Sequence, residues 1–111
     1  MAKPPKAYTQ FQRDFRRVWQ AYDRLGAAVH REGPIKAKAR ELVKLGMAIG
    51  GRLEGAVKAH TRLALEQGAT REEIRQVALM AITTVGFPTA MAALTWIEDV
   101  ISKRRGPRTR R

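Results

Sequence analysis

The stretch "EGAVKAHTRLALEQGATREEI", residues 54–74, predicts two helices joined by a turn and places a histidine on the first of them. Gly68 is a suitable C-terminal glycine, and Thr70 with Glu73 has the spacing of a capping box that starts the second helix. A lone histidine on an apolar helix face is usually a packing residue, so spacing alone does not assign His60 to chemistry. The apolar residues at helical spacing around it are Leu53, Ala56, Val57, Leu63 and Ala64.

Helical patterns continue outward from this stretch in both directions. Apolar residues from Phe11 to Val29 recur at steps of three and four, which predicts one long helix over residues 9–30 that ends at Gly33 and Pro34. Further helices are expected at about 36–50, 52–67, 71–85 and 88–104. No segment shows the period-two alternation of a half-buried strand. The fold class is therefore all-α, with about five to six helices.

Length and composition limit the organisation and the chemistry. A chain of 111 residues is most simply one domain, so we interpret residues 1–8 as a flexible lead, 9–102 as a single all-α domain and 103–111 as a basic tail. The absence of cysteine excludes disulfides, thiol redox chemistry and zinc–thiolate sites. The two histidines, His30 and His60, lack the spacing of metal ligands, so no metal or cofactor is expected.

One segment has nearly the length of a membrane span. Residues 76–97 contain no charged side chain, but Gly86 and Pro88 interrupt them and several polar residues dilute their hydrophobicity. Two buried helices that meet at a break fit this pattern better, so no membrane association is predicted. No apolar stretch of the signal-peptide type follows the start of the chain, and a cytoplasmic location is expected.

The net charge of +12 is unevenly distributed. Half of the excess lies in the last nine residues, "KRRGPRTRR", which contain no acidic side chain. The basic residues there are Lys103, Arg104, Arg105, Arg108, Arg110 and Arg111. A single copy of such a tail is most simply a solvated charge run that aids solubility. Several copies in an oligomer are expected to bind polyanions weakly through their phosphates, without reading sequence, because no base-reading helix or aromatic series accompanies the tail.

The central part of the chain resembles the carboxymuconolactone decarboxylase superfamily, which includes the alkylhydroperoxidase D proteins. The resemblance covers about residues 36–100 and rests on the order and spacing of three segments. These are "AHTRLALEQGATREEI", the break "GFPTA" and the "MAAL" that follows it. The resemblance implies a compact helical fold that commonly assembles as a trimer or as a hexamer, the hexamer being built as a trimer of dimers. We therefore expect a homo-oligomer, most simply a hexamer.

The resemblance also implies where a site would lie. The peroxidase branch has a Cys-x-x-Cys pair, a histidine four residues after it and a glutamate upstream, and the last two correspond to His60 and Glu41. The cysteine positions correspond to Leu53 and Ala56, so the mechanism that needs two thiols is excluded. The decarboxylase branch has a glutamate where this chain has Ala56, and often a tyrosine where this chain has Thr84. The chain therefore matches neither branch fully.

Three classes of function remain open at this point. The first is an enzyme, lyase-like or isomerase-like, that uses His60 as a proton carrier oriented by Glu41, because imidazole gains and loses protons near neutral pH. Arg52, which starts the same helix, is then a candidate for binding an acidic substrate. The second class is a non-catalytic oligomer of the same fold. The third is a nucleic-acid-associated protein that uses the basic tail. A salt bridge from Glu41 to Lys38 or Lys44 is the structural alternative to its role beside His60.

Overall fold

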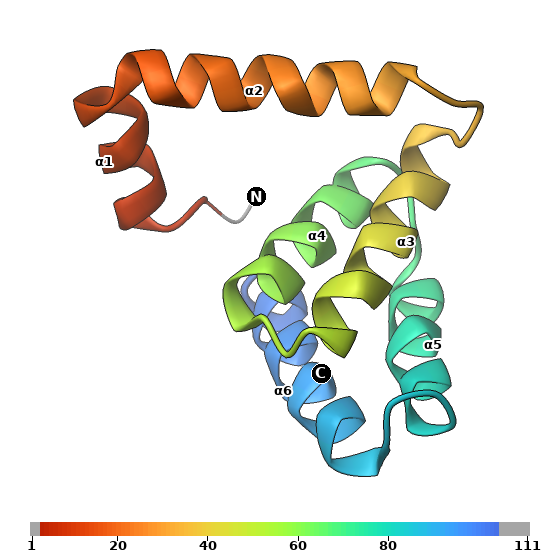
Figure 1. Ribbon diagram of the computed structural model, residues 1–111. Helices are drawn as coiled ribbons and strands as arrows, with labels where there is room; N and C mark the ends of the chain where they lie inside the picture. Colours follow the sequence, from red (N-terminus) through yellow and green to blue (C-terminus); the bar gives the residue numbers. More distant parts are fainter. Residues whose placement is uncertain (1–2, 105–111) are drawn as a thin grey trace. The chain divides into compact units, whose positions relative to one another are not determined.

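The computed structural model describes residues 3–104, which form six helices and no strand (Figure 1). This confirms the all-α class. The described chain divides into two compact units, one from Lys3 to Lys36 and the other beginning at Ala37.

The first unit consists of α1 (Lys6–Asp14) and α2 (Arg16–Arg31). The single helix predicted over residues 9–30 is wrong in this respect, because the helix begins at Lys6 and breaks at Phe15. One contact crosses the break: the indole N–H of Trp19 in α2 donates to the Tyr8 hydroxyl in α1 at 3.2 Å. The Phe11 and Phe15 rings lie 5.9 Å apart beside it. The apolar period continues through Phe15, so periodicity alone does not reveal the break.

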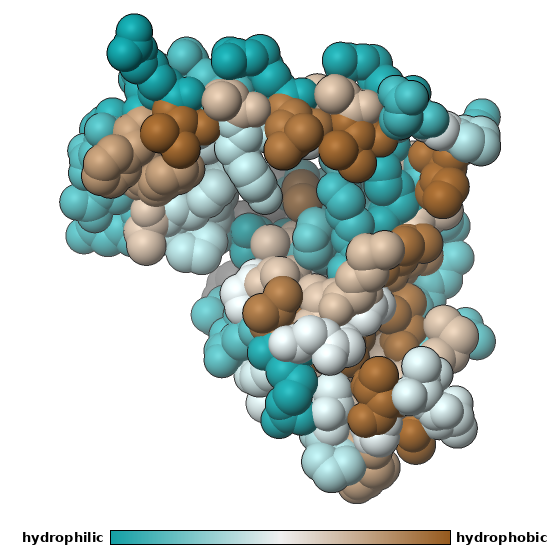
Figure 2. Space-filling model, in the orientation of Figure 1, coloured by the Kyte–Doolittle hydropathy of each residue, from teal (hydrophilic) through white to brown (hydrophobic). Residues whose placement is uncertain are grey.

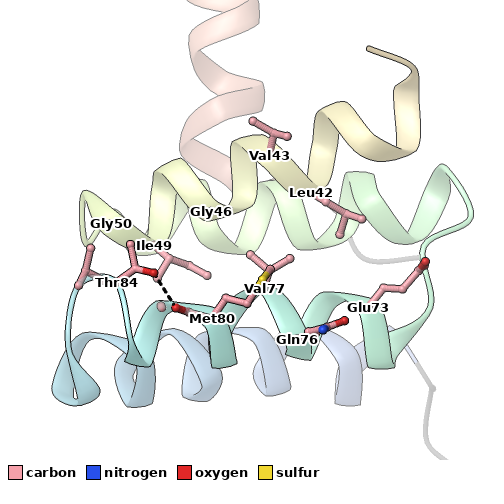
Figure 3. Close-up of a pocket in the computed structure, with 12 residues that line it drawn as sticks. Leu42, Val43, Gly46, Ile49, Gly50, Glu73, Gln76, Val77, Met80 and Thr84 are labelled. Atoms are coloured by element: carbon pink, nitrogen blue, oxygen red, sulfur yellow. Dashed lines mark hydrogen bonds between the residues drawn. The ribbon is translucent and has the colours of Figure 1, made fainter.

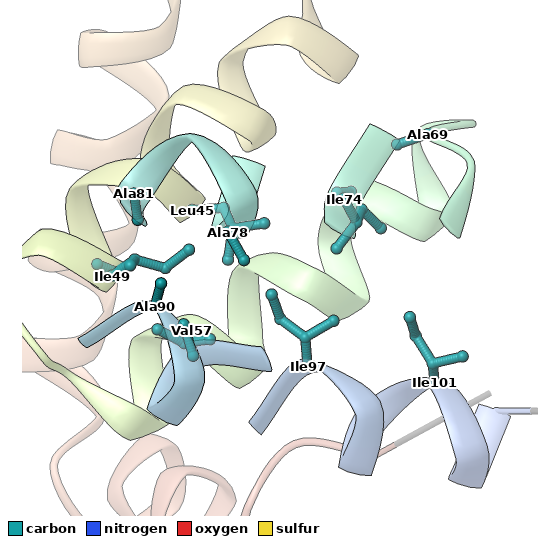
Figure 4. Packing of buried hydrophobic residues seen from close by; sticks show 13 residues of the cluster. Leu45, Ile49, Val57, Ala69, Ile74, Ala78, Ala81, Ala90, Ile97 and Ile101 are labelled. Carbon is teal, nitrogen blue, oxygen red and sulfur yellow. The ribbon is translucent and has the colours of Figure 1, made fainter. Parts of the chain in front are cut away.

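The second unit packs its four helices around one apolar core (Figure 4). They are α3 (Ala37–Gly50), α4 (Glu54–Glu66), α5 (Arg71–Ile82) and α6 (Phe87–Arg104). Many of the buried positions are alanines, which let helix axes approach closely, and larger aliphatic side chains fill the space between them. The buried residues include Leu45, Ile49, Val57, Ile74, Ala78, Ala90, Ala93, Ile97 and Ile101.

The turns between these helices follow the sequence signals closely. Gly68, after α4, has φ +92°, and Gly86, before α6, has φ +108°, a region that a side chain disfavours. The expected capping box is confirmed: Thr70 Oγ1 accepts from the Glu73 backbone N–H at 3.0 Å, and Glu73 Oε1 accepts from the Thr70 backbone N–H at 2.9 Å. The capping box therefore fixes the residue at which α5 begins.

Ion pairs join the helices on the outside of this unit. Lys58 on α4 contacts both Glu54 and Asp99 at 3.1 Å, so it links α4 to α6. The hydrogen bond from Lys58, together with the charge of Lys103, holds the pKa of the Asp99 carboxyl below its usual range. Arg75 on α5 makes two hydrogen bonds to Glu98 on α6, at 2.6 and 2.9 Å.

None of the helices in the described part of the chain is long and apolar enough to cross a membrane.

The capping box provides a test of the fold. Replacing Thr70 by Ala removes the side-chain acceptor at the start of α5, so the free energy of unfolding should fall by about 1 kcal/mol. Urea denaturation measures this change. Thr95→Ala is the control, because Thr95 lies exposed on α6 and bonds only within its own helix. An equal loss for both variants would contradict a specific role for the cap.

The same box predicts a pH dependence. The backbone N–H of Thr70, and then Lys38, hold the pKa of Glu73 below its usual range. A depressed carboxyl pKa stabilises the fold above the unfolded-state pKa, and this contribution is lost as the pH falls through the lowered value. The Glu73→Gln variant should therefore lose less stability than the wild type between neutral and acidic pH.

Candidate functional site

A hydrogen bond between neighbouring helices joins the two residues that the sequence singled out. Glu41 lies on α3 and His60 lies on α4, and Glu41 Oε1 is 2.8 Å from His60 Nδ1. The Glu41 side chain is 8% exposed and that of His60 is 22% exposed. The carboxylate is thus enclosed between the helices, whereas the His60 side chain keeps some access to solvent.

The direction of this hydrogen bond follows from the chemistry of its partners. An ionised carboxylate can only accept, so Nδ1 must carry the hydrogen that it donates. The lone pair of the neutral ring then lies on Nε2. This is the arrangement in which one histidine nitrogen is fixed by a carboxylate while the other is available for proton transfer.

The sequence also allowed Glu41 to form a salt bridge with Lys38 or Lys44 on its own helix. Lys38 Nζ instead contacts Glu73 Oε2 at 3.0 Å, which ties α3 to the start of α5. Glu41 reaches across to α4, where its carboxylate oxygen meets His60 Nδ1. The pairing of Glu41 with His60 was implied by family resemblance, and nothing in the local spacing of either helix reveals it.

Arg52 lies in the turn between α3 and α4 and does not contact this pair among the described contacts. Its backbone φ is +55°, a left-handed conformation that is strained for a residue with a side chain. Its guanidinium donates a hydrogen bond to Thr89 Oγ1, in the first turn of α6. At 1.5 Å per residue, the helix rise separates His60 from the start of α4 by about 9 Å.

The two positions that correspond to cysteines in the peroxidase branch have ordinary structural roles. Leu53 is the exposed N-cap residue of α4, and Ala56 is half-buried and packs against the core. Thr84, at the position of the decarboxylase tyrosine, donates to the backbone carbonyl of Met80 at 2.9 Å. The side chains at these three positions supply neither a thiol nor a phenol.

An apolar groove of about 520 Å³ lies between α3 and α5 (Figure 3). Gly46 and Gly50 leave space on its α3 side, where an added Cβ would come within 3.7 Å of Val77 and 3.9 Å of Val85. The residues that line it include Leu42, Val43, Ile49, Gln76, Val77, Met80 and Thr84. Neither His60 nor Glu41 is among them. The sequence analysis missed this groove, although two glycines four residues apart on one helix could have indicated it.

The basic tail is described only at its beginning. Lys103 lies on α6 and contacts Asp99 at 3.4 Å, and Arg104 is the last residue of that helix. Arg105, Arg108, Arg110 and Arg111 lie outside the described residues. Within residues 3–104, no three His, Cys, Asp or Glu side chains are grouped as a metal site would require.

Comparison with known proteins agrees with this architecture. The model of the carboxymuconolactone decarboxylase family matches residues 16–99. A crystal structure of a carboxymuconolactone decarboxylase family protein from Legionella pneumophila has a TM-score of 0.72 and 23% identity, and the match covers 86% of this chain and 85% of that one. At this identity the likeness concerns the fold. An uncharacterized protein from Haemophilus influenzae is 34% identical over 55 residues, which span 50% of this chain and only about half, 49%, of that relative.

The geometry of the Glu41–His60 pair predicts a particular tautomer. In protein labelled with ¹⁵N-histidine at mildly alkaline pH, His60 should show a protonated Nδ1 and an unprotonated Nε2, because Glu41 accepts from Nδ1. The ¹⁵N chemical shifts distinguish the two nitrogens, and Glu41→Ala should remove the preference for Nδ1–H. His30 provides an internal comparison in the same spectrum. A wild-type His60 protonated on Nε2 would contradict the assigned hydrogen bond.

Proposed function

Since the chain belongs to the carboxymuconolactone decarboxylase family, we propose that it performs acid–base chemistry on a small molecule, with His60 as the proton carrier. The observation that carries the proposal is the 2.8 Å contact between His60 Nδ1 and the buried Glu41 carboxylate. Glu41 acts as a positioning residue: it fixes the ring and stabilises the imidazolium that forms when Nε2 takes up a proton.

Two reactions need only this one proton carrier. In an isomerisation, Nε2 accepts a proton from a carbon next to a carbonyl and returns it to the other end of the conjugated system. In a decarboxylation, CO₂ leaves with its carbon–carbon bond broken, and protonated Nε2 delivers its proton to the carbanion that remains. The reactions are lyase-like or isomerase-like and require no sulfur, which suits a chain without cysteine.

The proposed substrate is acidic because of Arg52. Its guanidinium donates to Thr89 in the first turn of α6, and the N-terminus of a helix favours a negative charge. One of its five N–H donors bonds Thr89, so others can bind a carboxylate. A strained backbone at an exposed charged residue supports a functional reason for holding that residue in place.

The second candidate function is an oligomer of this fold without catalysis. The observation that favours it is the amount of apolar surface that α5 and α6 leave exposed. The larger exposed side chains of this region are Leu79, Met80, Val85, Phe87 and Met91. Burial of such a surface against further copies stabilises an assembly, and the hexamer expected from the resemblance is one arrangement that would achieve it.

Activity measurements separate the two candidates. A panel of small β-keto acids and unsaturated lactone acids should include a compound that the wild-type protein decarboxylates or isomerises, followed by CO₂ release or ultraviolet absorbance. His60→Ala should lower kcat/KM by about a hundredfold or more, because general acid–base groups contribute this much. His30→Ala, the same change on α2, should retain activity, and hydroperoxide reduction with a dithiol should stay at background.

Two results of these activity measurements would contradict the catalytic proposal. Full activity in His60→Ala would exclude this histidine as the proton carrier. If the wild-type protein turns over no member of the panel, the non-catalytic oligomer becomes the better account. Circular dichroism and sedimentation must show that each variant is folded and assembled as the wild type is.

Arg52 is tested by two matched substitutions. Arg52→Gly removes the charge and also relieves the left-handed backbone, so a loss of substrate affinity cannot be attributed to strain. For a carboxylate substrate, Arg52→Gly should raise KM by about tenfold or more with little change in kcat, as loss of a charged hydrogen bond predicts. Arg52→Lys should give an intermediate KM. An unchanged KM in Arg52→Gly would contradict the assigned role.

A further inference from the structure

Large apolar side chains line one face of α2, beginning at its N-cap residue Phe15, and each remains more than half exposed. We call this set the α2 seam: Phe15, Val18, Tyr22, Leu25 and Val29. Each of the five is between 57% and 64% exposed. Figure 2 shows hydrophobic residues gathered along one side of this helix and hydrophilic residues along the other. The exposed stripe is thus continuous over the length of α2.

The spacing of the seam is that of a coiled coil. Its members follow one another at steps of three, four, three and four residues, which are the a and d positions of a heptad repeat. A stripe limited to these two positions is narrow and fits the groove of one partner helix.

The residues that flank the seam allow such a partner to be identical. The positions at its two edges are uncharged, and most are small: Trp19, Ala21, Gly26 and Ala28. Every charged residue of α2 lies at the outer b and c positions, namely Arg16, Arg17, Asp23, Arg24 and Arg31. Two copies of this basic helix can therefore approach along the seam without placing like charges against each other across the interface.

The unit that carries the seam also lacks a core of its own. Neither α1 nor α2 contains a buried residue. Helices of 9 and 16 residues are marginal in water when nothing packs against them. A covering partner is consequently needed for this unit to be stably folded, and another copy of the chain is always present at equal concentration.

We propose that the α2 seam pairs with α2 of a second copy as a short two-stranded coiled coil, so that this unit is an assembly element. A membrane surface is the less suitable partner, because helices that lie on membranes bury a broad apolar face and not a two-position seam. The pairing concerns assembly and is independent of the chemistry proposed for His60.

A matched pair of glutamate substitutions tests the pairing. Leu25→Glu places a charge in the seam, and Ala27→Glu places the same charge on the opposite side of the same helix, where Ala27 is exposed. Sedimentation velocity over a range of micromolar concentrations should show that Leu25→Glu weakens self-association by about tenfold or more. Ala27→Glu should sediment as the wild type does. Equal masses for Leu25→Glu and Ala27→Glu at all concentrations would overturn the proposal.

Cross-linking identifies which surfaces meet. The chain has no cysteine, so a single introduced thiol reports without background. Ala21→Cys, at the edge of the seam, should be linked to its counterpart in a second copy by a short bis-maleimide, whereas Ala27→Cys should not. Failure of Ala21→Cys to cross-link in a folded, associated protein would overturn pairing through α2 in favour of another interface. A wild-type monomer that binds vesicles of anionic phospholipid would overturn it in favour of a membrane surface.

Discussion

A buried carboxylate must have a hydrogen-bond partner, and this constraint connects the packing of α3 and α4 to the chemistry proposed for the protein. Glu41 is enclosed between the two helices, and its carboxylate forms a hydrogen bond of 2.8 Å with His60 Nδ1. The contact joins α3 to α4 beside the apolar core that they share, and it also orients the imidazole. The proposed chemistry would therefore share this interaction with the packing of the two helices, and a substitution at Glu41 is expected to affect both.

Other polar contacts connect the helices of this unit around the Glu41–His60 pair. The capping box at Thr70 sets the start of α5, and Lys38 ties that start back to α3. On the other side, Lys58 links α4 to α6 through Asp99. These contacts lie on the surface and each stabilises the fold only modestly. Together they hold the four helices in place around a core in which alanine lets the backbones approach closely.

Local signals in the sequence predicted the second unit well and the first unit less well. Gly68, Gly86 and the capping box at Thr70 are local features, so the helices they bound could be placed from sequence. The break at Phe15 depends on contacts between α1 and α2, and an unbroken apolar period concealed it. The partner of Glu41 is nineteen residues away. Family resemblance could suggest it, whereas helical spacing favoured lysines one turn away.

The proposed chemistry requires that Glu41 holds His60 on one side and that the ring is open to a reactant on the other. A high-resolution crystal structure of the assembled protein measures this most directly. We expect His60 Nδ1 to stay within hydrogen-bond distance of Glu41 and Nε2 to face a cavity containing water or a small molecule. A structure in which Nε2 is packed against protein atoms, or in which Glu41 turns away to another partner, would contradict it.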